Sequence, residues 1–253
     1  MPDTTNISQN AGLGAKRNTF IAEQHNYTGL SPTDATEMAF AIFRQYFPQL
    51  RQDALKEVHA IVENELQKIP ATDIRCPSAK VVVPLLQNAS ITEEANLREM
   101  YGKLLARDMN QKTSSSIHPA YVEIINQMSS DDAELFRRIV EIDNSIPVAG
   151  IKFVFESQYL INVMPHYFSP LFNGFDPWKA SICLENLIRL NIFHFFAGTV
   201  NRYDYNKIKQ DSFVIEQFEF TKKNNPSRQI SMQLSEYVIQ MNDFGREFAR
   251  LCF

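Results

Sequence analysis

The apolar pattern of this 253-residue chain changes character near its middle, at Asn144-Ser145-Ile146-Pro147. Before this point apolar residues recur every three or four positions, as Leu55, Val58 and Val62 do, which predicts amphipathic helices. After it β-branched and aromatic residues become dense, and the segment Ile151–Met164 fits either a strand or a helix. We therefore expect a mainly α protein of the α+β class, in which a helical region precedes a small antiparallel sheet.

Helix start and stop signals divide the first half of the chain. Residues 1–30 are rich in Asn, Thr, Gln and Gly and are predicted to form a flexible tail. Ser31-Pro32 is typical of a helix start, and Ser90-Ile91-Thr92-Glu93 matches a capping box. Pro119 is expected to begin a further helix, and Ser129 or Ser130 to cap the next. These signals predict a helical domain over residues 31–145.

The second half, residues 146–253, has the order of a winged helix. Asp176-Pro177 predicts a helix that reaches Leu190, in the recognition position of such a fold. A final helix is expected after Asn242-Asp243. Between these helices the sequence predicts a short strand, Ile192–Phe196, and a hairpin with the strands Phe213–Thr221 and Gln229–Gln240. The basic turn Lys222–Ser227 would join the two strands of the hairpin and form the wing.

Composition limits the classes of function. The net charge is −4, so any nucleic-acid contact must come from a local basic patch. Only 8 glycines occur, which argues against a glycine-rich nucleotide-binding α/β fold. The 3 cysteines and 5 histidines show no disulfide or metal-ligand spacing, and we expect no metal and no cofactor. The N-terminus lacks an apolar run, and charges interrupt the apolar stretch 178–200, so a cytoplasmic protein without a membrane span is expected.

Basic residues of the expected winged helix are candidates for contact with DNA. The recognition helix would read the groove and the wing would contact phosphate. Acidic residues such as Glu185 and Glu219 lie close by in the sequence, so the charge balance favours a solvated surface or protein contact over DNA. The candidates are Lys179, Arg189, Lys222, Lys223 and Arg228.

Two histidines have spacings that invite a catalytic interpretation. Arg189 and His194 are separated by four residues, the spacing used by a class of helical ribonucleases, in which histidine is an acid or base and arginine stabilises phosphate charge. The structural alternative, which we favour, places Arg189 on the surface and His194 in a strand. His118 precedes Pro119 and is interpreted as a helix cap or packing residue.

An aromatic series marks the first predicted helix. Phe40, Phe43, Tyr46 and Phe47 recur at near-helical spacing. They are most simply core residues, but a helix that is apolar around much of its circumference also suits a partner protein or a second copy of the chain. Self-association through this helix is therefore a second possibility.

Several blocks of the sequence resemble one family of bacterial proteins. They are Glu94-Ala95-Asn96-Leu97-Arg98-Glu99-Met100-Tyr101, Ile117-His118-Pro119-Ala120-Tyr121-Val122-Glu123-Ile124-Ile125, Leu184-Glu185-Asn186-Leu187-Ile188-Arg189-Leu190 and Met241-Asn242-Asp243-Phe244-Gly245-Arg246-Glu247-Phe248. The chain is similar, from about residue 70 onward, to the abortive infection alpha family. The resemblance implies defence against phage and supplies no catalytic motif. We expect a non-enzymatic defence protein that binds a phage or host protein as a sensor or an interfering subunit. The alternatives are a winged-helix DNA-binding regulator and a toxic ribonuclease that uses Arg189 and His194.

Overall fold

A layer of helices forms the first half of the protein. The computed structural model describes residues 29–46, 55–142, 145–156, 159–201 and 203–253. The change of pattern at the middle of the chain coincides with the start of the first strand, at Ser145. The helices before it are α2 (Pro32–Tyr46), α3 (Lys56–Gln67), α4 (Ala79–Ile91), α5 (Ala95–Asp108), α6 (Ala120–Asn126) and α7 (Ser130–Ile142), with short 3₁₀ turns η3 (Ala71–Asp73) and η4 (Ser114–Ser116).

Local capping chemistry explains one of these helix starts and contradicts another. Ser129 and Asp132 form a reciprocal cap at α7: the Asp132 amide donates to Ser129 Oγ at 3.2 Å, and the Ser129 amide donates to Asp132 Oδ2 at 2.7 Å. The capping box predicted at Ser90–Glu93 is wrong. Ser90 still belongs to α4, where its hydroxyl donates to the Gln87 carbonyl, because α4 continues to bury Leu86 and Ala89 and the next helix begins only at Ala95.

The second half contains the predicted antiparallel sheet. Its strands are β1 (Ser145–Phe155), β2 (Leu160–Tyr167), β3 (Phe193–Ala197) and β4 (Ile230–Met241). The described strands form one sheet in the order β2-β1-β4-β3. β1 and β4 pair along their whole length, from Ser145 opposite Gln240 to Phe155 opposite Ile230. The ambiguous segment 151–164 thus belongs to two strands of a hairpin.

The helices of this half leave the winged-helix prediction unconfirmed, because one of them occupies the segment that the sequence predicts to be the first strand of the hairpin. They are α8 (Ser169–Phe172), α9 (Pro177–Arg189), the 3₁₀ helix η5 (Tyr205–Gln210), α10 (Ser212–Lys223) and α11 (Asp243–Cys252). The predicted strand 213–221 is wrong, because this segment is α10. Lys222 and Lys223 are its last two residues and do not form the turn of a hairpin. Asp211 caps the start of this helix, and the helical form places the Phe218 ring on Phe153 of β1 at 5.1 Å.

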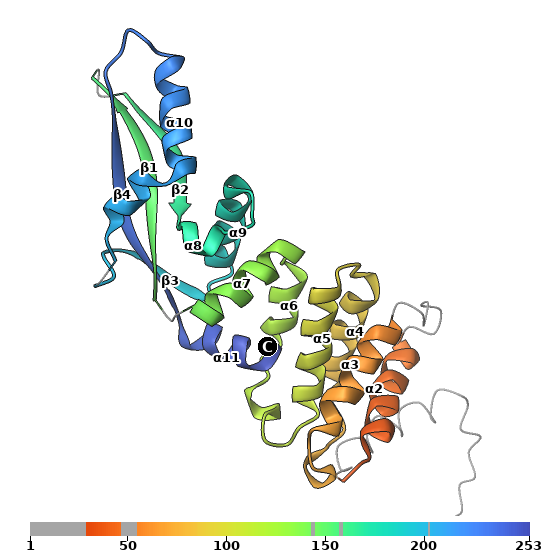
Figure 1. Cartoon of the computed structure of the whole chain (residues 1–253). Coiled ribbons are helices and arrows are strands. Elements are labelled where there is room, and N and C mark those ends of the chain that lie inside the picture. The colour runs from red at the N-terminus through yellow and green to blue at the C-terminus, as the bar shows by residue number, and fades with distance from the viewer. Residues whose placement is uncertain (1–28, 47–54, 143–144, 157–158, 202) are drawn as a thin grey trace, which may run out of the picture.

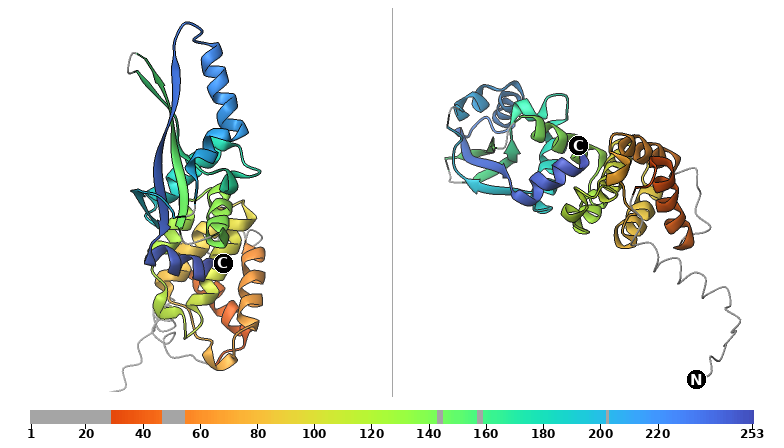
Figure 2. Two further views of the ribbon diagram at one scale, coloured as in Figure 1. Left: turned by 60° about the vertical axis from the view of Figure 1, so that its left-hand side comes forward. Right: turned by 90° about the horizontal axis from the view of Figure 1, so that it is seen from below.

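The sheet and α10 project from the helical layer as an arm (Figure 1). A second view shows α10 lying along the strands on one side (Figure 2). The two halves share one hydrophobic core. The last helix, α11, returns to the helical layer, where the rings of Phe136 and Phe248 stack at 5.6 Å and Lys103 donates to the Phe253 carbonyl at 3.3 Å. The described part of the chain therefore starts in the helical layer with α2 and returns to it with α11, and the arm lies between α7 and α11 in the sequence.

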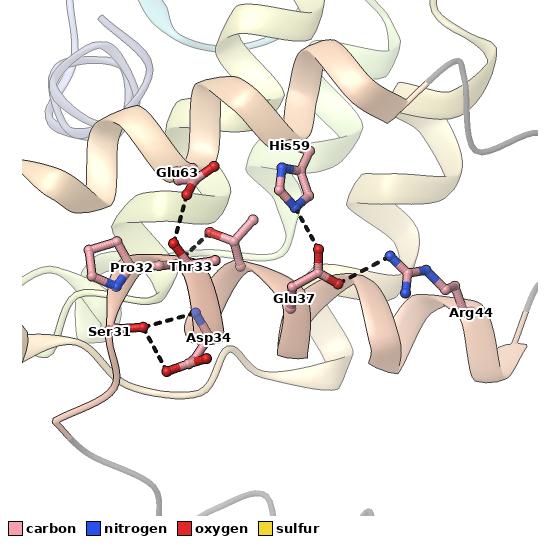
Figure 3. A network of polar contacts seen from close by, with 9 residues as sticks. Ser31, Pro32, Thr33, Asp34, Glu37, Arg44, His59 and Glu63 are labelled. Atoms are coloured by element: carbon pink, nitrogen blue, oxygen red, sulfur yellow. Dashed lines mark hydrogen bonds and ion pairs between the residues drawn. The ribbon is translucent and has the colours of Figure 1, made fainter.

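The first described helix, α2, lies on α3 and α4 through its apolar side. Phe40 and Phe43 are 4% and 2% exposed. Polar contacts line the open side of the same junction: Thr33 donates to Glu63 at 2.8 Å, and Glu37 lies 3.1 Å from His59 (Figure 3). Exposed contacts of this kind contribute little, so burial of the two phenylalanines holds α2 in place.

Candidate functional site

The helix α9 is built by the local signals in its sequence. Asp176 caps it, since one of its carboxylate oxygens accepts the Lys179 amide at 2.9 Å, and Pro177 occupies the first turn. Its inner side buries Leu184 and Leu187. Asn191 ends the segment in the left-handed region at φ 57°, a conformation that asparagine tolerates. The prediction of a helix from Asp176 to the neighbourhood of Leu190 is confirmed.

The outer side of α9 exposes two large apolar side chains. Trp178 is 43% exposed and Ile182 is 67% exposed. They lie one turn apart, and Glu185 and Arg189 continue the same face of the helix. The Trp178 ring meets Phe213 of α10 edge-on at 5.7 Å, so the exposed face of α9 adjoins the base of the arm. We call this set of four residues the α9 face.

Both basic candidates on α9 are engaged by groups within the protein. Lys179 forms an ion pair with Asp131, and the hydrogen bond from this lysine raises its pKa. The Arg189 guanidinium donates to Asn186 Oδ1 at 2.7 Å and to Gln127 Oε1 at 2.9 Å. A phosphate group at α9 would have to compete with these partners.

The other three basic candidates lie at the far end of the arm. Lys222 and Arg228 line an open cavity of about 710 Å³ together with Glu156, and Lys223 is exposed beside them. Lys222 is paired with Glu219 at 3.0 Å, and Arg228 lies 5.8 Å from the centre of the Phe155 ring. The base of the arm, where α9 lies, and the far end of α10 are well separated (Figure 1). The five candidates thus form two groups, and their contact with DNA stays a prediction.

Arg189 and His194 lie in different elements. Arg189 is the last residue of α9, whereas His194 is an exposed residue of β3 that pairs with Gln240 of β4. Each of the two is in the described part of the chain, and no hydrogen bond or ion pair joins them there. This placement is the one that the structural interpretation of the pair predicts.

His118 has a structural role at the start of α6. Its Nδ1 accepts the Ala120 amide at 3.1 Å. Its ring packs edge-on against Tyr121 at 6.1 Å and Phe244 at 5.8 Å. Both functions that the sequence predicts for this residue, a helix cap and a packing residue, are confirmed.

The aromatic series of α2 divides between the core and the undescribed part of the chain. Phe40 and Phe43 are buried, which confirms the interpretation of these two as core residues. The side chain of Tyr46 and the whole of Phe47 lie outside the described residues. Self-association through this helix stays a prediction.

A second cavity, which no sequence motif predicts, lies at the base of α10. This cavity has a volume of about 760 Å³ and is lined by Tyr167, Lys207 and Asp211 among other residues. Asp211 caps α10 by accepting the Phe213 amide at 3.0 Å. The signal for this cap was present in Asp211-Ser212, a good helix start, but it was overlooked because the following residues resemble a strand.

Two further observations bear on the kinds of site. Over the described ranges, no group of three or more His, Cys, Asp or Glu side chains is arranged to hold a metal ion. In those same ranges, none of the helices combines the length and the apolar character needed to cross a membrane.

Comparison with known proteins identifies the family. The model of the abortive infection alpha family matches residues 50–252, which include every described element after α2. The family implies a role in abortive-infection defence against phage. No curated protein and no solved structure matches the chain significantly. Because the match covers most of its length, the chain belongs to the abortive infection alpha family.

Proposed function

We propose that this protein acts in abortive-infection defence by binding a phage or host protein through the α9 face. Family membership supports the biological role. The exposure of Trp178 and Ile182 on neighbouring turns of one helix is the observation that supports protein contact. The interaction would take place in the cytoplasm, where phage components are made.

The chemistry of the α9 face suits a protein better than a polyanion. Adjacent exposed apolar side chains mark interaction surfaces, and tryptophan is among the residues that most often dominate binding energy at such surfaces. Lys179 and Arg189 already have partners in the protein. Two apolar side chains of α10, Ile215 and Phe220, are also exposed, at 44% and 63%.

An affinity experiment with matched variants tests this proposal. Ile182→Gln removes an exposed apolar side chain from the α9 face, and glutamine is as compatible with a helix as isoleucine. Ile91→Gln is the control, because Ile91 is 71% exposed at the end of α4 in the helical layer. Tagged wild-type protein and both variants are recovered from a bacterial host with and without phage infection, and the bound protein and nucleic acid are identified.

We expect a discrete protein that is enriched after infection, retained by Ile91→Gln and lost by Ile182→Gln. A second copy of this chain as the captured protein would assign self-association to the α9 face. Nuclease-sensitive DNA as the sole companion in both conditions would contradict the proposal and favour the regulator. RNA cleavage that disappears in folded His194→Ala would favour the ribonuclease.

A further inference from the structure

The cavity at the base of α10 combines aromatic walls with separate acidic and basic groups. It lies where the end of β2, α8, η5 and the start of α10 meet. The rings of Tyr167 and Phe213 lie nearly parallel, with centres 5.7 Å apart, and Phe172 meets Tyr167 edge-on at 5.5 Å. Tyr203 contributes a further half-buried ring to the lining. The cavity has a volume of about 760 Å³, which is within the range of small-molecule sites.

The carboxylate of Asp211 is held in place and keeps one oxygen available. The Tyr167 hydroxyl donates to its Oδ1 at 2.6 Å, and the Phe213 amide donates to the same atom at 3.0 Å. Burial and this hydrogen bond raise the pKa of Tyr167, which therefore remains a donor. Among the residues that the structure describes, none donates to Asp211 Oδ2. A carboxylate oxygen accepts up to two hydrogen bonds, so Oδ2 retains its full capacity.

Lys207 supplies the opposite charge at the same cavity. It is an exposed residue of η5 and lines the cavity with Asp211. Within the described chain its ammonium group has no carboxylate partner, unlike Lys179 or Lys222. An ammonium group of this kind binds phosphate as a point charge.

These groups select a ligand with three properties: a flat ring that packs against aromatic side chains, N–H donors on one edge of the ring, and an anionic group. Nucleobases stack on aromatic side chains irrespective of their identity, so the edge decides between them. Guanine alone presents two adjacent N–H donors, N1–H and N2–H, on its Watson–Crick edge. Adenine and cytosine place an acceptor beside their donor, and uracil flanks its donor with two acceptors, which a carboxylate repels.

We propose that the cavity binds a guanosine monophosphate unit. The base lies against the half-buried rings of Tyr203 and Phe213, since Tyr167 and Phe172 are only 2% and 3% exposed. The N1–H and N2–H edge of the base lies on Asp211 Oδ2, and the phosphate is bound by Lys207. The unit is supplied either as the free nucleotide or within single-stranded nucleic acid. This inference is independent of the α9 face, because it uses different side chains and is tested without a protein partner.

Isothermal titration of the purified full chain tests the proposal with GMP, guanosine, AMP and the oligonucleotide UUGUU. We expect GMP to bind at least about tenfold more tightly than AMP, since a good pair of hydrogen bonds to a base edge gives discrimination of that order. Removing the phosphate, as in guanosine, weakens binding to the wild type. Tighter binding of UUGUU than of GMP would identify single-stranded nucleic acid as the source of the unit.

Three variants test which side chains bind the base and the phosphate. Asp211→Asn keeps an oxygen for the Phe213 amide and suits a helix cap, so the fold is retained, but GMP affinity falls about tenfold or more. Lys207→Ala lowers the affinity for GMP and leaves the affinity for guanosine unchanged. Lys209→Ala, in the same 3₁₀ helix but outside the cavity lining, is the control and binds as the wild type does. Should Asp211→Asn fail to fold, Lys207→Ala still tests the proposal, because Lys207 is exposed and its replacement does not disturb the core.

The proposal is overturned if neither GMP nor UUGUU binds at concentrations up to millimolar, or if AMP binds as tightly as GMP. It is also overturned if Lys207→Ala leaves GMP affinity unchanged. None of these results affects the prediction for Ile182→Gln, so failure of the nucleotide site is distinguishable from failure of the α9 face.

Discussion

The substitution Gly245→Ala tests how the arm is attached to the helical layer. Gly245 lies in the first turn of α11, and its amide donates to Asn242 Oδ1 at 2.8 Å. A Cβ atom at this position would overlap the Ile192 carbonyl oxygen and lie 3.0 Å from the Ile192 carbonyl carbon. The Ile192 carbonyl is itself fixed, because it accepts the Asn242 amide at 3.2 Å. The methyl group therefore forces α11 away from the backbone that leads into β3.

The expected net loss of stability is about 2 kcal/mol. Overpacking costs about 1–3 kcal/mol, and the upper end applies here because the obstructing atoms are backbone. The gain in helix propensity from glycine to alanine offsets about 1 kcal/mol. For a chain of this length the melting temperature falls by about 4–8 °C.

Thermal unfolding followed by circular dichroism measures the effect, with Gly102→Ala as the comparison. Gly102 gains the same helix propensity, and the nearest obstructing atoms there are Cγ2 and Cβ of the Ile61 side chain, at 2.6 and 2.9 Å, so the overlap is smaller than the one with the Ile192 carbonyl oxygen. We expect Gly102→Ala to lose less stability than Gly245→Ala. An unchanged or raised melting temperature for Gly245→Ala would show that α11 does not approach the Ile192 carbonyl closely enough to exclude a methyl group.

Three further predictions concern buried polar groups. Tyr101→Phe is expected to be neutral or stabilising by up to about 1 kcal/mol in urea unfolding, because the buried Tyr101 hydroxyl has no partner among the described residues. Burial raises the pKa of Asp108 to about 6, so this carboxyl binds a proton more tightly in the folded protein than in the unfolded chain. The stability that protonated Asp108 contributes below about pH 4 is therefore lost as the pH rises through 6. Asp108→Asn should therefore gain up to about 3 kcal/mol relative to the wild type between pH 4 and pH 7; a constant difference would contradict this. Burial also raises the pKa of the thiols of Cys76, Cys183 and Cys252. All three should therefore react with a thiol reagent at neutral pH only after unfolding, and fast labelling of the native protein would disprove this prediction.

Elements with a strong local start signal are the ones that the sequence predicts well. Asp176-Pro177 and Asn242-Asp243 each supply a cap whose hydrogen bond forms within four residues, and the helices α9 and α11 begin there. Strands β3 and β4 are likewise predicted nearly to their ends. These features depend on neighbours in the chain, which is why a single sequence reveals them.

The features that sequence reasoning missed depend on contacts between distant residues. The segment 213–221 is rich in aromatic and β-branched residues and resembles a strand, but it belongs to a helix whose Phe218 ring packs on Phe153. The pairing of β4 between β1 and β3 is equally non-local. The candidate sites follow the same rule: exposure of Ile182 and the meeting of Tyr167 with Asp211 both depend on the packing of the arm.

Site-specific photocrosslinking shows whether the α9 face contacts a protein during infection. A photoreactive amino acid replaces Ile182 in the α9 face, or Ile91 in α4 as the control, and cells are irradiated before and during phage infection. We expect a covalent adduct with one phage or host protein, formed during infection from position 182 and not from position 91. Protein contact through the α9 face would be contradicted if no adduct forms at position 182 or if adducts form equally at both positions. Adducts with nucleic acid alone would also contradict it.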